Sequence, residues 1–150
     1  MQCQAFSYRS DPPVPRFPDD RPILIFDGHC ELCSGFARFI LRTDRQGRFR
    51  LMAAQSPVGA ALYRHFGLDP TDYETNILIE DGRAWFKSEG SIRIFETLGW
   101  PWSLMAIARA LPRGLRDRLY DIVARNRLRW FGVRPSCYLP DSSQADRFIA

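Results

Sequence analysis

The chain has 150 residues, of which 45% are hydrophobic and 13% aromatic. That supply of apolar side chains suits one domain with a core and excludes disorder throughout. The formal net charge is +4, and a chain of this length needs no disulfide to fold, so its four cysteines are available for chemistry. The longest apolar stretch, Leu104 to Leu111, is interrupted by Arg109 and is far shorter than the roughly 20 residues of a membrane-spanning helix.

Residues 1–21 are predicted to be a flexible, proline-rich leader. Four prolines disfavour regular structure there, and no apolar segment typical of a secretory signal occurs. The expected compartment is therefore the cytoplasm, where cysteines point to catalysis or metal binding and not to structural disulfides. Cys3, in the leader, is interpreted as an incidental thiol.

Residues 22–99 are predicted to form the folded core, which begins with a strand, a turn and a helix. Ile23–Phe26 is continuously apolar, as expected for a strand covered on both faces. The turn Asp27–Cys30 follows. From Glu31 an apolar face recurs at helical spacing until Gly47. Arg48–Ala53 then alternates between polar and apolar residues and predicts a second strand.

The second half of the core is predicted to add a helix, a hairpin and a last helix. Ser56-Pro57 is typical of a helix start. Asp81-Gly82 predicts a tight hairpin between strands at Asn76–Ile79 and Ala84–Lys87. Ser88 is expected to cap the last helix. The resulting order, β-α-β-α-β-β-α, predicts an α/β fold of the thioredoxin-like type.

Residues 100–150 are predicted to be an additional C-terminal helical extension, packed on the core within the same domain. Its second helix carries an apolar stripe of Leu115, Leu119, Ile122, Val123 and Trp130. The stretch from Arg109 to Arg134 contains eight arginines but only two acidic residues, Asp117 and Asp121. The favoured interpretation is a solvated helix face, and the alternative is a basic surface for anionic lipid or an acidic partner. No nucleic-acid recognition motif accompanies the charge, so nucleic acid is not an expected partner.

The segment Cys30-Glu31-Leu32-Cys33 places two cysteines three residues apart at the predicted start of a helix. The unpaired N–H groups of a helix start stabilise an anion and lower the pKa of a thiol placed there. Cys30 is therefore the predicted attacking thiolate and Cys33 the more buried resolving thiol. This pattern predicts thiol–disulfide exchange through a mixed disulfide on Cys30, with a protein or small-molecule thiol or disulfide as the substrate. The redox-active disulfide Cys30–Cys33 would serve as the only redox group, with no further cofactor and no metal ligand assigned.

Three neighbouring residues are expected to adjust this chemistry. Glu31 adds negative charge that opposes the thiolate, which favours reductase or isomerase work over strong oxidation. His29 would offset that charge when protonated, or act as a base, but it also fits an ordinary loop residue. Asp27 either exchanges protons with Cys33 or serves as a turn residue bonded to local N–H groups.

The residues from Phe26 to Cys33, with Phe36 and Arg38-Phe39, resemble the signature of the DCC family of thiol–disulfide oxidoreductases. The resemblance continues through Ala53–Ser56, Ala124–Arg127 and Cys137–Pro140 and covers roughly residues 22–140. It implies a thioredoxin-like fold and redox activity, and it assigns the family's aspartate and two cysteines to Asp27, Cys30 and Cys33.

Two other interpretations stay open. Cys30, Cys33 and Cys137 with one histidine would make a copper or zinc site, because thiolates are soft ligands. Cys137 alone would be a third redox thiol or simply a small packed residue. The other alternative is a membrane- or partner-docking protein whose cysteine pair only senses redox state.

Overall fold

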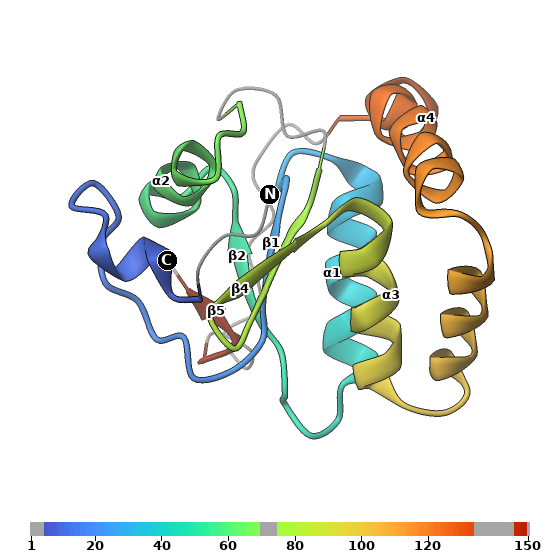
Figure 1. The fold of residues 1–150 in the computed structure, drawn as a ribbon, viewed down its shortest axis with the longest axis horizontal. Helices are drawn as coiled ribbons and strands as arrows, with labels where there is room; N and C mark the ends of the chain where they lie inside the picture. Colours follow the sequence, from blue (N-terminus) through green and yellow to red (C-terminus); the bar gives the residue numbers. More distant parts are fainter. Residues whose placement is uncertain (1–4, 70–74, 134–145, 150) are drawn as a thin grey trace.

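The computed structural model describes residues 5–69, 75–133 and 146–149 (Figure 1). The expected order of the core is confirmed: β1 (Ile23–Phe26), α1 (Glu31–Thr43), β2 (Arg50–Ala53), α2 (Pro57–His65), β3 (Ile77–Glu80), β4 (Arg83–Phe86) and α3 (Lys87–Leu98). Around it lie two 3-10 helices, a long helix and a short strand: η1 (Ser7–Ser10), η2 (Trp102–Ala110), α4 (Arg113–Phe131) and β5 (Phe148–Ile149).

The strands form one mixed sheet in the order β4-β3-β1-β2-β5. β1 runs parallel to β2 and antiparallel to β3, and β4 returns antiparallel to β3. The predicted Asp81-Gly82 hairpin is present, with both residues at positive φ as a tight turn between strands requires. This arrangement is a thioredoxin-like α/β fold.

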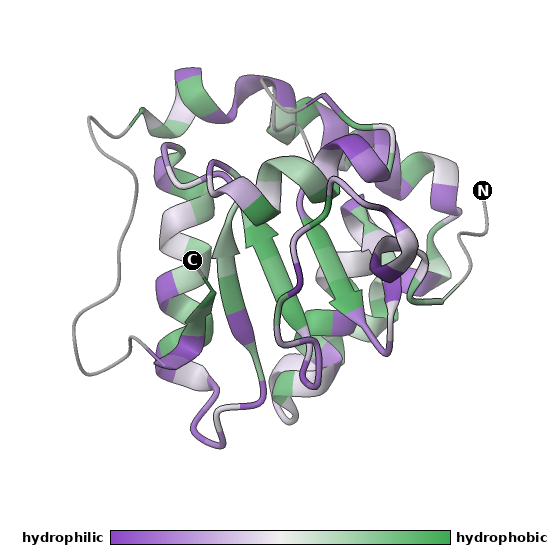
Figure 2. Cartoon of the chain, turned by 90° about the vertical axis from the view of Figure 1, so that its left-hand side faces the viewer, coloured by the Kyte–Doolittle hydropathy of each residue, from purple (hydrophilic) through white to green (hydrophobic). Residues whose placement is uncertain are grey.

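The sheet is covered on both faces, which explains the uninterrupted apolar run of β1. Ile23 and Ile25 pack on the side of α2, whereas Leu24 and Phe26 pack on the side of α1 and α3. All four side chains are fully buried. Figure 2 shows the central strands coloured as hydrophobic over most of their length. β1 is thus the middle of the core, and its carboxyl end delivers the chain to the cysteine pair.

The described part of the expected leader lies against the hairpin and α2. The Phe6 N–H donates to the Gly82 carbonyl at 2.8 Å, and Tyr8 is only 2% exposed. A side chain at Gly82 would collide with the Phe6 ring, since an added Cβ would lie 2.5 Å from it. His65 of α2 bonds Ser7 and Asp11, so a histidine on an otherwise apolar helix face has polar partners.

The ends of several elements differ from the expectation for reasons seen in their contacts. Ser88 does not cap α3, because the helix already begins at Lys87 with Phe86 at the cap position; the Ser88 hydroxyl donates to Asp117 of α4 instead. β5 was not expected; it adds to β2 in parallel, next to the ion pair of Arg147 with Asp44 at 2.7 Å. The stripe on α4 points outward: Leu119 and Ile122 are each 51% exposed.

In the part of the chain that the structure describes, no helix has both the length and the apolar character required to cross a membrane.

Candidate redox site at the start of α1

Cys30 and Cys33 lie close together where β1 gives way to α1. Cys30 is the residue that caps the helix, and its Sγ accepts the Cys33 backbone N–H at 3.3 Å. The Cys30 carbonyl accepts the Ser34 N–H at 2.9 Å, which closes the first turn. Both thiols are free. A sulfur therefore occupies the cap position that oxygen atoms of Ser, Thr or Asp usually fill.

The two thiols have opposite acidities. Hydrogen bonding from the Cys33 thiol lowers the pKa of Cys30 to about 6, although burial opposes the change; the Cys33 backbone N–H and the charge of Arg127 also lower it, and Asp27 raises it. The pKa of Cys33 is raised, first by its bond to Cys30 and then by burial. At neutral pH the pair therefore favours a Cys30 thiolate beside a protonated Cys33.

Asp27 lies beneath the pair and is 4% exposed. Its Oδ1 accepts the His29 backbone N–H at 3.0 Å and the Gln55 Nε2 at 2.6 Å. Its Oδ2 lies 3.3 Å from Nη2 of Arg127. The hydrogen bond from the His29 N–H is the one expected of a turn residue. The ion pair of Asp27 with Arg127 was not expected. Proton exchange between Asp27 and Cys33 stays a prediction.

Arg127 and Gln55 complete the site, and the sequence pattern did not single them out. Arg127 reaches in from α4, 5% exposed, and its Nη1 donates to the Ala124 carbonyl at 2.7 Å. Gln55 also accepts the Gly28 N–H at 3.0 Å, so its side-chain amide binds both the Asp27 carboxylate and the Gly28 backbone. The available signal was spacing: Tyr120, Ala124 and Arg127 fall on one helix face, which marks this arginine as inward-facing.

His29 and Glu31 lie around the pair. His29 is half-buried in the turn, and its backbone N–H bonds Asp27. The Glu31 carboxylate lies 3.8 Å from Nη2 of Arg38, on the outer side of α1. The expected effects of both residues on the thiolate stay predictions.

Cys30 is covered, and Cys33 borders a cavity. Cys30 is 0% exposed, and its backbone forms an isolated antiparallel β-bridge with Val133. The Glu31 N–H donates to the Gly132 carbonyl at 3.3 Å. A cavity of about 200 Å³ lies beside Cys33 between α1, α3 and α4, with largely apolar walls that include Leu32, Phe36, Phe95, Val123 and Ala124. Gly132 and Val133, directly after α4, thus lie against the backbone of the predicted nucleophile.

Cys3 and Cys137 lie outside the described residues. Within residues 5–69, 75–133 and 146–149, no three His, Cys, Asp or Glu side chains gather as a metal site requires. The predicted third thiol, and any metal set that includes Cys137, therefore stay predictions.

Comparison with known proteins gives a consistent result. Residues 24–133 match the family described as DCC1-like thiol-disulfide oxidoreductase. The uncharacterized protein YuxK of Bacillus subtilis is 37% identical over 127 residues, which cover 85% of this chain and 93% of that protein. A chloroplastic DCC family protein of Arabidopsis thaliana is 38% identical over 122 residues, covering 81% of this chain and 71% of the plant protein.

No solved structure matches the chain. The family match runs from Leu24 in β1 through η2 and α4, so it includes both cysteines, Asp27 and Arg127. The chain belongs to the DCC1-like family of thiol-disulfide oxidoreductases.

Proposed function

We propose that the protein reduces or exchanges disulfides with the Cys30–Cys33 pair, Cys30 attacking and Cys33 resolving. The observation that carries this proposal is the position of Cys30 as the cap of α1, with the Cys33 N–H directed at its sulfur. The Cys33 thiol and the Cys33 backbone N–H both favour the anionic form of Cys30 at neutral pH. An ordinary thiol, with a pKa of about 8.5, is mostly protonated there.

The exchange proceeds in two balanced steps. The Cys30 thiolate attacks one sulfur of the substrate disulfide, a mixed disulfide forms, and the other substrate sulfur leaves as a thiolate that takes up a proton. Cys33 then loses its proton and attacks Cys30 Sγ, which closes the Cys30–Cys33 disulfide and releases the second substrate thiol. The substrate gains two electrons and two protons, and an external thiol must reduce the pair again.

Access is part of the mechanism. Because Cys30 is 0% exposed and its backbone pairs with Val133, we expect a substrate sulfur to reach it when the chain at Gly132 and Val133 moves aside. Among the described residues, the backbone contact there is the long hydrogen bond from the Glu31 N–H to the Gly132 carbonyl at 3.3 Å, so we expect a local displacement at the end of α4 to open the site. The substrate is a protein or small-molecule disulfide, the redox-active cysteine pair is the only cofactor, and the cytoplasm is the expected compartment.

Trapping the mixed disulfide tests the assignment of roles. In a Cys3→Ser/Cys137→Ser background, the Cys33→Ser variant should accumulate a substrate adduct on Cys30, visible by intact mass, because nothing displaces the bound sulfur. The Cys30→Ser variant should form none and should lose disulfide reductase activity. The assignment would be contradicted if the Cys30→Ser variant formed an adduct on Cys33 as fast as the Cys33→Ser variant forms one on Cys30.

A further inference from the structure

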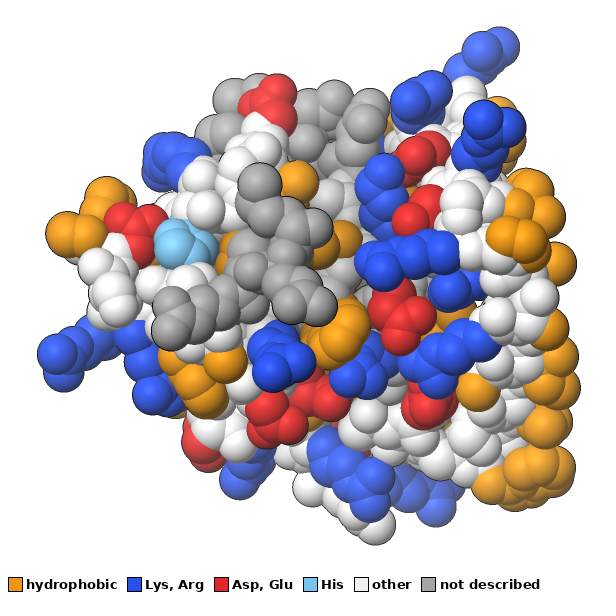
Figure 3. Space-filling model, in the orientation of Figure 1, with side chains coloured by type: hydrophobic (Ala, Val, Ile, Leu, Met, Phe, Trp, Pro, Cys, Tyr) orange, Lys and Arg blue, Asp and Glu red, His pale blue; other side chains and the backbone are white. Residues whose placement is uncertain are grey.

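The exposed hydrophobic side chains are gathered in one region of the molecule. Among the described residues, every exposed large hydrophobic side chain lies between Trp100 and Val133. Figure 3 shows hydrophobic side chains in a column along the edge formed by η2 and α4 (right), with Lys and Arg gathered nearby. We call this the docking surface and define it by Leu104, Ile107, Leu111, Leu115, Leu119 and Ile122. A concentration of this kind marks an interaction site and is not the scattered exposure of an ordinary surface.

On α4 the apolar stripe borders a row of arginines. Leu115, Leu119 and Ile122 follow one another at four and three residues, so they share one side of the helix. Arg118, Arg125 and Arg129 follow at seven and four residues and form the adjacent row. All three arginines are exposed, and none makes an ion pair with any residue that the structure describes.

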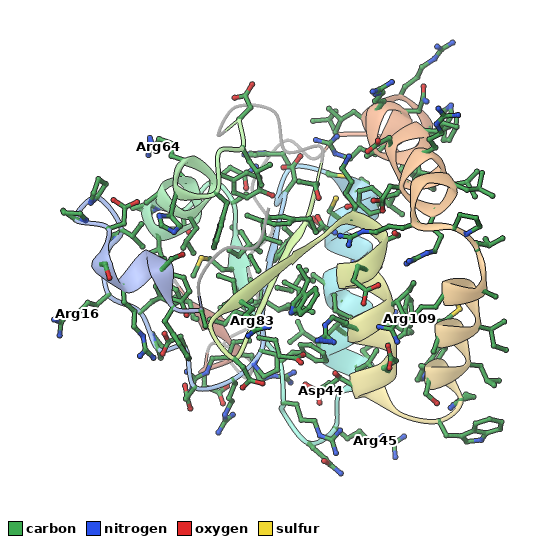
Figure 4. All side chains as sticks on the ribbon, viewed as in Figure 1. Arg16, Asp44, Arg45, Arg64, Arg83 and Arg109 are labelled. Carbon is green, nitrogen blue, oxygen red and sulfur yellow. The ribbon has the colours of Figure 1, made fainter. Side chains whose placement is uncertain are left out.

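Acidic side chains are turned away from this surface. Between residues 100 and 133 the only acids are Asp117 and Asp121. Asp117 accepts from Ser88, and Asp121 lies 3.0 Å from Lys87, so both face α3. Arg109 is likewise directed from η2 toward α3, where it pairs with Glu89 and Glu96 (Figure 4). What remains outward is apolar and positively charged.

We propose that the docking surface binds an anionic lipid membrane, with η2 and α4 lying in the plane of the interface. An apolar stripe beside a row of arginines complements acyl chains and anionic headgroups together. Trp100, 78% exposed, and Trp130, 56% exposed, are the residue type that prefers the headgroup level. A second copy is a poor occupant, because a symmetric interface would bring the arginine row against itself without a carboxylate in return.

The proposal concerns a partner and does not rest on the redox function. The helix that binds Asp27 through the inward-facing Arg127 presents a different side to the membrane, so a docked molecule would hold the cysteine pair near the lipid surface.

Sedimentation with vesicles tests the proposal on the full chain. Wild-type protein should sediment with phosphatidylcholine vesicles that contain phosphatidylglycerol, sediment little with phosphatidylcholine alone, and bind less at high salt. Leu119→Gln with Ile122→Gln should lower binding about tenfold or more, because two apolar side chains no longer enter the lipid. These positions are half-exposed and glutamine is a good helix former, so the fold is preserved.

A charge-matched pair of variants separates a specific surface from net charge. Arg118→Gln/Arg125→Gln/Arg129→Gln should lose binding. Arg16→Gln/Arg64→Gln/Arg83→Gln removes the same charge from exposed positions away from η2 and α4 and should keep binding (Figure 4).

Three outcomes would overturn the proposal. One is the absence of sedimentation with anionic vesicles, including a result in which the protein binds polyglutamate instead. Another is equal loss of binding in the two arginine variants. The third is a concentration-dependent dimer in analytical ultracentrifugation that Leu119→Gln/Ile122→Gln abolishes, which would assign the surface to a second copy.

Discussion

At the scale of single residues, two buried charges act on the Cys30 sulfur in opposite directions, in addition to the larger effect of the Cys33 hydrogen bond. Arg127 lowers the pKa of Cys30 and Asp27 raises it, while the two side chains hold each other at 3.3 Å. Neither charge is free to reorient toward solvent, because both residues are at least 95% buried. The pair therefore adjusts the pKa of Cys30, which the hydrogen bond from Cys33 lowers most, and it also holds the geometry of the turn.

Substituting each partner should shift the Cys30 pKa in opposite directions. Arg127→Gln should raise it and Asp27→Asn should lower it, measured by titrating thiolate ultraviolet absorbance in the Cys3→Ser/Cys137→Ser background. Arg127→Lys keeps the charge and should leave the pKa near that of the parent. Each neutralising change should also cost about 3–5 kcal/mol of unfolding free energy, since a buried charge loses its partner. A shift of the same sign in both variants would refute the electrostatic role.

The partner of Arg127 was beyond local pattern analysis for a physical reason. An arginine is buried only where a partner compensates its charge, and that partner, Asp27, lies 100 residues earlier in the chain. By contrast, the acidity of Cys30 was predictable, because a cap position and its N–H donors are set within four residues of sequence.

At the scale of elements, the core was predictable because its signals are local and agree with one another. Ser56 before Pro57 caps α2 as expected, with its Oγ accepting the Gly59 N–H at 3.0 Å. The extension was less predictable. Helical spacing reveals that α4 has an apolar stripe but not what covers it, and here the stripe faces outward. β5 is two residues long, too short for any alternation to be visible.

Two glycine-to-alanine changes should shift the unfolding free energy of the protein in opposite directions. Gly59→Ala should lower the unfolding free energy by about 1–3 kcal/mol, because its Cβ would lie 2.4 Å from the Ala53 carbonyl oxygen, a backbone atom that cannot turn aside. Gly114→Ala, in the first turn of α4, meets nothing within 4 Å and should raise it by up to about 1 kcal/mol. Urea unfolding measures both. A harmless Gly59→Ala would mean that α2 does not pack on the end of β2 as described.

At the scale of the whole molecule, the acidity of one thiol links stability to pH. The folded-state pKa of Cys30, about 6, lies below its unfolded value, so the stabilisation is complete above the unfolded value and is lost as pH falls through about 6. The raised pKa of Cys33 lowers stability only above the ordinary pKa of a thiol, where Cys33 ionises in the unfolded chain but not in the folded protein.

Reduced wild-type protein should therefore gain unfolding free energy relative to Cys30→Ala between about pH 6 and 8. The difference should rise by up to about 1.4 kcal/mol per pH unit, since one proton is released on folding. Urea titrations of both proteins in reducing buffer at several pH values measure it. A difference that stays constant over this window would show that the Cys30 thiol is not acidic in the folded state.

The central place of β1 in the sheet determines how slowly its amide hydrogens exchange. Its backbone is held by β2 on one side and β3 on the other, and its side chains are fully buried. Amide hydrogens of Leu24 and Ile25 should therefore be among the slowest to exchange with deuterium, whereas that of Glu31, bonded to the Gly132 carbonyl at 3.3 Å, should exchange much sooner. Brief local openings would then uncover the sulfur while the strand that anchors it keeps its protection.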